Sequence, residues 1–318
     1  MSVIADPLFP DPLFPDPLFP GFETGRVVNG PAEIFYRAGG PADGAPVFLL
    51  HGFPQTGAMW ARVALRLAMR FRVIVPDLRG YGASRGPVGQ EHYAKRRMAG
   101  DVLAVADALG IARFDLAGHD RGGRVSYRLA LDLVAEGRAE RLGKLAVLDI
   151  LPTLDYWRRT GEIGFGMKVY HWFFLAQPYP LPERLIGAAP DFYVEDKLSR
   201  WSGRDDLSAF EPAALEAYRA NARDPETLRA MCDDYRAGAL EDVAEDAADE
   251  SAGRKIAAPT LALWGGAGIA QKAGAEGPLA VWRRWCDQVE GRALDCGHFL
   301  PEERPEETAE ALETFFGA

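Results

Sequence analysis

The sequence has little cysteine, no long apolar run and no excess of basic charge. Its three cysteines, Cys232, Cys286 and Cys296, are far apart and lack the spacing of a zinc site or a disulfide framework. Free thiols in a reducing compartment are therefore expected. No apolar stretch is long enough to cross a bilayer, and no basic segment followed by an apolar run opens the chain. A cytoplasmic location is the resulting expectation.

The charge balance excludes two classes of partner. A net charge of −10 disfavours binding to nucleic acid or to an anionic membrane surface, because both would be repelled. A small anionic substrate would need positive charge gathered locally at its site. With 318 residues, of which 48% are apolar, the chain can bury one large core that carries an insertion.

A pentapeptide repeat opens the sequence. Asp-Pro-Leu-Phe-Pro occurs three times in succession, at 6–10, 11–15 and 16–20. Proline at this density excludes helix and sheet ladders, so residues 1–25 are predicted to form an extended, mobile tail. Each copy offers a Leu-Phe pair that could dock on a partner, but a duplication of little consequence is the favoured interpretation.

The remainder predicts an α/β fold, a mostly parallel sheet with helices on both faces. Near-continuous apolar runs, typical of buried parallel strands, alternate with helical stretches. These runs are 47–50, 72–75, 114–117 and 145–148. Each ends in a loop rich in glycine, proline or polar residues, and such loops meet at one edge of a parallel sheet, where ligands bind.

An insertion separates two parts of this core. Residues 152–251 are rich in aromatic residues and charge, show helical periodicity and contain no strand run, so they are predicted to form a helical cap. The core is then 26–151 and 252–318, with the sheet pattern resuming at 259–264. An acidic run, 241–250, is expected to be a solvated helix face or linker rather than a metal site.

Asp120 occupies the central position of a nucleophile elbow, the turn Gly118-His119-Asp120-Arg121-Gly122 between a strand and a helix. A serine there would form acyl-enzymes. A carboxylate instead displaces a leaving group from saturated carbon and becomes an ester that water must open. The expected chemistry is alkyl transfer to Asp120 followed by hydrolysis.

The second step needs a base and an acid that orients it. His298, in a loop after the last strand-like run, completes the order nucleophile, acid, histidine of α/β-hydrolases. The loop 265–270 contains no acid, which leaves Asp149, at the end of the preceding strand, as the orienting carboxylate. The alternative for Asp149 is a helix or turn cap.

Two further groups are expected beside Asp120. The backbone N–H groups of Phe53 and Arg121 are the expected oxyanion donors. Arg121 and Arg124 follow the nucleophile by one and four residues, so both guanidinium groups can bind the carboxylate of a small acid and offset its repulsion from Asp120. The alternative is that one or both arginines pair with Asp120 or with a surface acid.

These residues resemble the fluoroacetate (haloacetate) dehalogenases of the α/β-hydrolase superfamily. The resemblance runs from about Phe19 to the C-terminus. Its most specific element is Asp-Arg-x-x-Arg, because haloalkane dehalogenases and epoxide hydrolases usually place tryptophan after the nucleophile. The matching motifs are His51-Gly52-Phe53-Pro54-Gln55-Thr56, Asp77-Leu78-Arg79-Gly80-Tyr81-Gly82, His119-Asp120-Arg121-Gly122-Gly123-Arg124, Leu148-Asp149-Ile150-Leu151-Pro152-Thr153, His171-Trp172 and Gly297-His298-Phe299.

The resemblance adds expectations that the residues alone do not give. It implies that His171, Trp172 and Tyr235 form a halide pocket in the cap, whereas their pattern alone would indicate packing. It also implies a homodimer. The predicted function is the hydrolysis of short 2-haloacids, fluoroacetate to glycolate and fluoride and also chloroacetate, with no metal and no cofactor.

Other functions stay open at this stage. An epoxide hydrolase would use the same Asp, His and Asp with cap tyrosines such as Tyr156, Tyr170 and Tyr235, but would leave the two arginines without a role. A chloroacid dehalogenase with little defluorinating activity is closer still. The alternative outside enzymes is an inactive homologue that binds a small acid.

Overall fold

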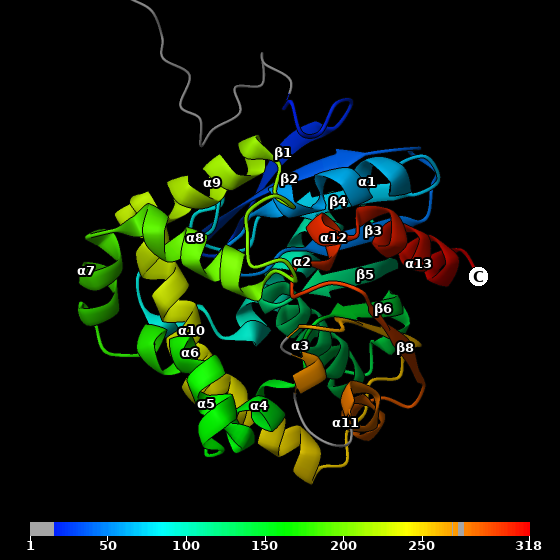
Figure 1. The fold of residues 1–318 in the computed structure, drawn as a ribbon. Coiled ribbons are helices and arrows are strands. Elements are labelled where there is room, and N and C mark those ends of the chain that lie inside the picture. Colours follow the sequence, from blue (N-terminus) through cyan, green and yellow to red (C-terminus); the bar gives the residue numbers. More distant parts are fainter. Residues whose placement is uncertain (1–15, 269, 273–276) are drawn as a thin grey trace, which may run out of the picture.

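The computed structural model describes residues 16–268, 270–272 and 277–318. A sheet of eight strands, in the order β1-β2-β4-β3-β5-β6-β7-β8, crosses the core (Figure 1). The first two strands and the β2–β4 pair are antiparallel, and all other pairs are parallel. The predicted α/β fold is confirmed. The strands are β1 (Glu23–Asn29), β2 (Ala32–Gly39), β3 (Pro46–Leu50), β4 (Arg72–Pro76), β5 (Phe114–His119), β6 (Leu142–Leu148), β7 (Thr260–Gly265) and β8 (Val289–Leu294).

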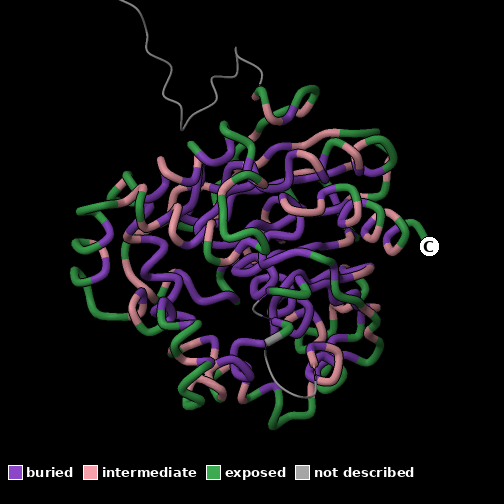
Figure 2. Tube along the Cα trace, in the orientation of Figure 1, coloured by how far each residue is buried: buried purple, intermediate pink, exposed green. Residues whose placement is uncertain are grey.

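Helices cover both faces of the sheet, which explains the near-continuous apolar strands. In β3, Val47 and Leu49 pack into one core cluster while Phe48 and Leu50 pack into the other. Figure 2 shows the central strands almost entirely buried. One face carries α1 (Ala61–Leu67), α12 (Leu300–Glu303) and α13 (Pro305–Gly317); the other carries α2 (Lys95–Ala108), α3 (Arg121–Ala135) and α11 (Gly277–Trp285).

Only helices lie between β6 and β7 in the described chain, over the residues predicted as the cap. Contacts between α10 and the start of α3 place these helices over the carboxyl end of β5. They are α4 (Thr153–Arg159), α5 (Ile163–Lys168), α6 (Tyr170–Leu175), α7 (Leu181–Gly187), α8 (Pro190–Trp201), α9 (Pro212–Arg223) and α10 (Pro225–Ser251). Short 3-10 helices occur at Gly57–Trp60, Gln90–His92, Ala139–Arg141 and Ala270–Lys272.

The acidic end of α10 is not a solvated face, and that prediction is wrong. Asp242, Asp246 and Asp249 are buried. Asp242 accepts the backbone N–H of Lys95 at 2.8 Å, and Arg128 forms ion pairs with the other two aspartates. The spacing i, i+4, i+7 puts the three carboxylates on one stripe of the helix, where cations of the core partner them.

The third copy of the N-terminal pentapeptide packs against the core. Oδ2 of Asp16 lies 2.7 Å from Nε of Arg37, and the guanidinium of Arg37 lies 4.9 Å from the ring centre of Phe19. Phe19 is only 1% exposed and meets Phe22 edge to face. Residues 16–25, predicted as part of a mobile tail, are therefore folded, with β1 beginning at Glu23, and that boundary of the tail is wrong. The first two copies lie outside the described residues.

No helix in the described part of the chain is long and apolar enough to cross a membrane.

Candidate active site

Asp120 lies in a strained turn between β5 and α3. Its φ is 46° and its ψ is −115°, a left-handed conformation that is costly for a residue with a side chain. The turn is tight because Gly122 approaches the neighbouring strand: a Cβ atom there would lie 2.4 Å from the carbonyl oxygen of His51. The sharp turn lifts the Asp120 carboxylate out of the strand end, as a nucleophile elbow requires.

The carboxylate of Asp120 is held by a backbone donor and kept ionised. Oδ1 accepts a hydrogen bond from the N–H of Phe53 at 2.8 Å. Gly52 allows this approach, because a Cβ atom there would lie 2.5 Å from Cβ of Asp120. Burial acts to raise the pKa of Asp120, but the nearby His298 and Arg124 outweigh it, so that pKa is lowered. Asp120 is thus an anion at neutral pH.

His298 and Asp149 meet, as the chain order predicts. Nδ1 of His298 lies 2.5 Å from Oδ2 of Asp149. The other ring nitrogen, Nε2, lies 3.9 Å from Oδ2 of Asp120 and is buried without a hydrogen-bond partner among the described residues. Burial alone would lower the pKa of His298, but the hydrogen bond and charge of Asp149, with the charge of Asp120, raise it.

The loop after β7, which contains no acid, encloses the Asp149 carboxylate instead. The N–H of Gly265 donates to Oδ1 of Asp149 at 3.1 Å. Gly268 approaches so closely that a Cβ atom there would lie 2.4 Å from the same oxygen. The glycines of this loop therefore make room for a carboxylate that comes from the neighbouring strand.

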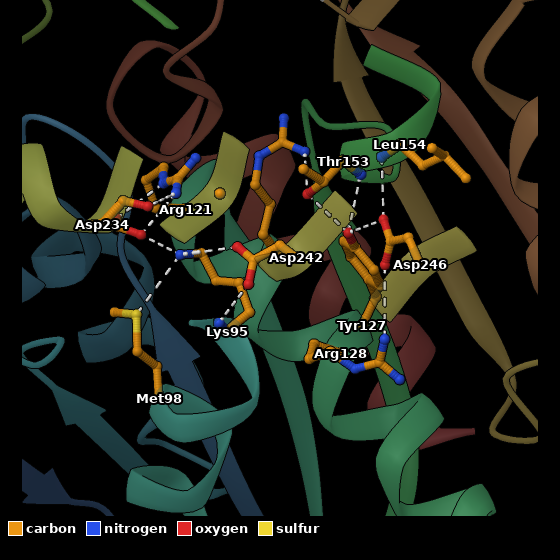
Figure 3. A network of polar contacts seen from close by, with 12 residues as sticks. Lys95, Met98, Arg121, Tyr127, Arg128, Thr153, Leu154, Asp234, Asp242 and Asp246 are labelled. Atoms are coloured by element: carbon orange, nitrogen blue, oxygen red, sulfur yellow. Dashed lines mark hydrogen bonds and ion pairs between the residues drawn. The ribbon is translucent and has the colours of Figure 1, made fainter. Parts of the chain in front are cut away.

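Arg121 is paired with a carboxylate that the sequence analysis did not single out. Its Nε and Nη2 donate to the two oxygens of Asp234, at 2.9 and 2.6 Å (Figure 3). Asp234 also accepts the hydroxyl of Tyr81 at 2.9 Å and forms an ion pair with buried Lys95. Asp234 thereby fixes one edge of the Arg121 guanidinium. Nη1 of Arg121 has no hydrogen-bond partner in the described part of the chain.

Arg124 differs from Arg121 in having no carboxylate partner among the residues described. It is 1% exposed, and its Nη1 donates to neutral acceptors only, the carbonyl of Leu151 at 2.9 Å and the hydroxyl of Thr153 at 3.2 Å. Its guanidinium lies 4.5 Å from the ring centre of Trp172 and 4.8 Å from that of Tyr156. Its Nε is buried without a partner in the described chain. A buried cation in this state favours a bound anion.

The three cap residues assigned to the halide pocket lie together. The ring centres of His171 and Trp172 are 5.9 and 6.4 Å from that of Tyr235, which also meets Phe53 at 5.2 Å. Burial lowers the pKa of His171 and raises the pKa of Tyr235, so both are neutral donors. None of the three side-chain donors has a hydrogen-bond partner within the described residues.

Trp201, at the end of α8, belongs to the site although no motif indicated it. Its ring centre lies 4.6 Å from that of His171, 5.7 Å from that of His298 and 6.4 Å from that of Phe53. An isolated tryptophan in a helical segment gives no signal of this position.

A cavity of about 510 Å³ lies beside Trp201, between the cap and the loop after β7. Three cationic residues line it, together with apolar side chains. The lining residues are Gly164, Phe165, Met167, Lys168, Tyr170, Lys197, Arg200, Trp201, Ala267 and Gly268. Two of these lining residues also border the site, because Gly268 approaches the Asp149 carboxylate and the ring of Trp201 contacts that of His171.

Metal ligation is not indicated: within residues 16–268, 270–272 and 277–318, no group of three or more His, Cys, Asp or Glu side chains could hold a metal ion.

Comparison with known proteins shows extensive similarity. The family of the α/β-hydrolase fold matches residues 45–305. Fluoroacetate dehalogenase of Burkholderia sp is 40% identical over 93% of this chain and 94% of its own length. Soluble epoxide hydrolase of Corynebacterium sp. (strain C12) is 32% identical over 91% and 95%. The solved structure of a proposed epoxide hydrolase from Pseudomonas aeruginosa is 40% identical, with a TM-score of 0.86 over 95% of this chain and 98% of the other.

Proposed function

This chain belongs to the α/β-hydrolase fold family, and on that premise we propose that it is a hydrolytic dehalogenase of short 2-haloacids. Fluoroacetate is the leading substrate, with glycolate and fluoride as products, and chloroacetate is a second substrate. The similarity to fluoroacetate dehalogenase over most of both chains supports a hydrolase that acts on carbon–halide bonds.

The single observation that carries the substrate assignment is Arg124, which has no carboxylate partner among the described residues. Its guanidinium is buried next to the anionic Asp120 and contacts only neutral acceptors and aromatic faces in the described chain. A substrate carboxylate supplies the missing counter-ion. Arg121 offers a second donor through Nη1, while Asp234 holds its other edge. An uncharged substrate would leave Arg124 without an anion.

The first step is an in-line displacement by Asp120. The oxygen Oδ2 attacks the carbon that carries the halogen, the new carbon–oxygen bond forms, and the halide leaves with the electron pair of the broken bond. Donors from His171, Trp172 and Tyr235 stabilise the negative charge that develops on the halide. Since Oδ1 is held by the N–H of Phe53, it becomes the carbonyl oxygen of the ester.

The second step is hydrolysis of that ester. His298, oriented by Asp149 through the 2.5 Å contact, removes a proton from water as the water oxygen attacks the ester carbonyl. The negative charge then forms on Oδ1, where the N–H groups of Phe53 and Arg121 are the proposed donors. Collapse breaks the ester bond, and the glycolate oxygen takes the proton from His298. Asp120 keeps one oxygen from water and releases the second water proton to solvent, which restores its carboxylate.

An epoxide hydrolase is the second candidate, because a relative with that activity matches 91% of the chain and Tyr235 lies beside the site. The other cap tyrosines favour it less. Tyr170 is exposed and accepts a hydrogen bond from Lys197, and Tyr156 stacks on Trp172. This function also leaves Arg124 without an anion.

Halide release from fluoroacetate and chloroacetate by the purified protein at neutral pH tests the proposal, with the Asp120→Asn variant as control. Fluoride release that requires Asp120 supports defluorination. Chloride release alone retains the mechanism and removes fluoroacetate as substrate. No halide from either acid, with turnover of an epoxide, would replace the proposal by the second candidate.

A further inference from the structure

We propose that Glu303 is a positioning residue for His298: it joins the His298 loop to the cap segment Trp201–Gly203, and this junction serves the hydrolysis of the ester more than its formation. The inference rests on the proposed function, since it assigns a residue to the second step. Glu303 ends the short helix α12 and was not singled out in the sequence.

The carboxylate of Glu303 binds the backbone on both sides of His298. Oε2 accepts the N–H of Gly297 at 2.9 Å, and Oε1 accepts the N–H of Phe299 at 3.0 Å. These two donors flank the histidine in the chain. A carboxylate that accepts both fixes the peptide planes from which the imidazole projects, so Glu303 restrains His298 without touching its ring.

The same carboxylate binds the cap. Oε2 also accepts the N–H of Gly203 at 2.7 Å. Directly beside this contact, the N–H of His298 donates to the carbonyl of Trp201 at 2.8 Å. The backbone of the cap and the backbone of the His298 loop are therefore joined by one direct hydrogen bond and, through the carboxylate of Glu303, by a second link beside it.

Two glycines make this close approach feasible. A Cβ atom on Gly297 would lie 2.3 Å from the backbone nitrogen of Gly203, and a Cβ atom on Gly203 would lie 2.8 Å from that of Gly297. Neither position accepts a side chain without moving one backbone relative to the other. The junction is thus sterically specific as well as hydrogen bonded, and it can be disturbed from either side.

The junction fixes the groups of the second step more than those of the first. Nucleophilic attack needs Asp120, which sits on the rigid elbow between β5 and α3 and is held by Phe53. Ester hydrolysis needs His298 in hydrogen-bonding reach of water and aligned with Asp149. A small displacement of a positioned base is enough to slow a step by roughly 100-fold. Loss of Glu303 should therefore make ester hydrolysis the slow step.

The charge of Glu303 gives a second readout. The negative charge of Glu303 contributes to raising the pKa of His298, although burial and Asp149 act more strongly. His298 must be neutral to act as a base, so the rate of hydrolysis rises with pH through this pKa. Removing the charge lowers the pKa and moves the midpoint to lower pH. The titratable groups near His298 are Asp149, Asp120, Glu303, His119 and His171.

The test compares Glu303→Gln with wild type and with Glu306→Gln, an exposed glutamate nearby in the sequence. The Glu303→Gln side chain keeps its size, but its NH2 group cannot accept the backbone N–H groups that the carboxylate accepts. Halide is measured in the first turnover and in the steady state with chloroacetate. We expect Glu303→Gln to release a burst of about one halide per site and then to turn over roughly 100-fold more slowly than wild type. Mass spectrometry should detect the covalent ester.

A second variant separates positioning from folding. Gly203→Ala lies in the cap and does not touch the His298 ring, yet it opens the same junction and should also give a burst. Circular dichroism checks that both variants fold. If both then keep the wild-type ratio of first to later turnovers, and if Glu303→Gln keeps the wild-type pH midpoint, the inference is wrong. If wild type itself releases no halide, the proposed function fails instead, and the titration of His298 by NMR in Glu303→Gln still tests the positioning role.

Discussion

Nε2 of His298 lies 3.9 Å from Oδ2 of Asp120, the carboxylate oxygen that Phe53 does not hold. The separation is too long for a hydrogen bond. It suits a histidine that acts on water in the second step and not on the nucleophile in the first, because an ionised Asp120 needs no base. The two steps of the proposed reaction can therefore be separated by substitution.

The first prediction removes the base. His298→Asn should release about one halide per site from chloroacetate and then stop, because the ester forms but water is not activated. Rapid-quench measurement of chloride together with mass spectrometry of the intact protein checks this. Asp120→Asn, run in parallel, should show no burst. Sustained turnover by His298→Asn would remove His298 from this role.

The second prediction concerns the unpaired cation. Arg124→Gln should lower kcat/KM for chloroacetate by roughly 10- to 100-fold, since a hydrogen bond to a charged group contributes about 1.5–3 kcal/mol. The same variant should act on neutral chloroacetamide with little change relative to wild type. Steady-state kinetics with both substrates test the role of the charge. Equal losses on the two substrates would argue against carboxylate binding by Arg124.

The third prediction concerns the cavity beside Trp201. Lys168 lines it, is exposed and forms no ion pair among the described residues. On a chain with a net charge of −10, such a cation should attract an anionic substrate. Lys168→Gln should lower kcat/KM several-fold at low ionic strength, as an order of magnitude for screened surface charges, and leave kcat unchanged.

Added salt gives the control for this effect. The difference between Lys168→Gln and wild type should shrink as the salt concentration rises, because screening removes the attraction. Lys255→Gln makes the same charge change before the amino end of β7, at the opposite end of the strand from the site, and should not alter kcat/KM. A loss that is independent of salt would point to a packing defect.

The fourth prediction is a pH dependence of stability. Burial raises the pKa of Glu302 to about 8 although Tyr218, Arg62 and Gln55 oppose this. The folded protein thus keeps the proton over a range in which the unfolded chain, with an ordinary pKa near 4.5, has lost it. The contribution of Glu302 is fully present below pH 4.5 and is lost as the pH rises through 8.

Replacing Glu302 tests whether its contribution to stability falls as the pH rises. Glu302→Gln cannot ionise. Its free energy of unfolding minus that of wild type should therefore be larger, meaning a relatively more stable variant, at about pH 9 than at about pH 5. Urea unfolding at the two pH values measures the difference, with Glu306→Gln as the exposed control. A difference that does not change with pH would show that Glu302 is ionised when folded.

The fifth prediction concerns the packed pentapeptide. Phe19→Ala should lower the free energy of unfolding by about 3–5 kcal/mol, the usual loss for a buried phenylalanine. The matched control is Phe14→Ala, the same residue in the copy before it. Urea unfolding of both variants measures the comparison. If Phe19→Ala costs no more than Phe14→Ala, the packing of the third copy does not contribute to stability.

The central parallel strands and the order of the proposed catalytic residues could be predicted from the sequence for a physical reason, whereas the antiparallel strands β1 and β2 were not predicted. Strands buried on both faces must be apolar throughout, as in 47–50 and 145–148, and the loops after them converge. Asp120 and Asp149 each follow such a strand, and His298 lies in the loop after the edge strand β8. Their meeting follows from the topology.

Other contacts could not be predicted because their signal lies in pairing and not in periodicity. The buried stripe of α10 is built from aspartates, which look like a solvent face until Arg128 and Lys95 of other helices partner them. Arg121 and Asp234 are 113 residues apart, and no sequence pattern in either segment indicates that the two residues pair. Trp201 lies at the site only because of how the cap helices pack, which the sequence pattern does not indicate.

Because it is the third copy of the pentapeptide that packs on the core in the described structure, the number of copies before it can change without a change in that packing. Loss or gain of one five-residue unit always leaves an Asp-Pro-Leu-Phe-Pro unit directly before Gly21. Its aspartate then faces Arg37 and its phenylalanine fills the site of Phe19. A change in the number of copies therefore leaves the packed unit in place as long as one copy remains. Selection for stability acts on that last copy and not on the number of copies before it.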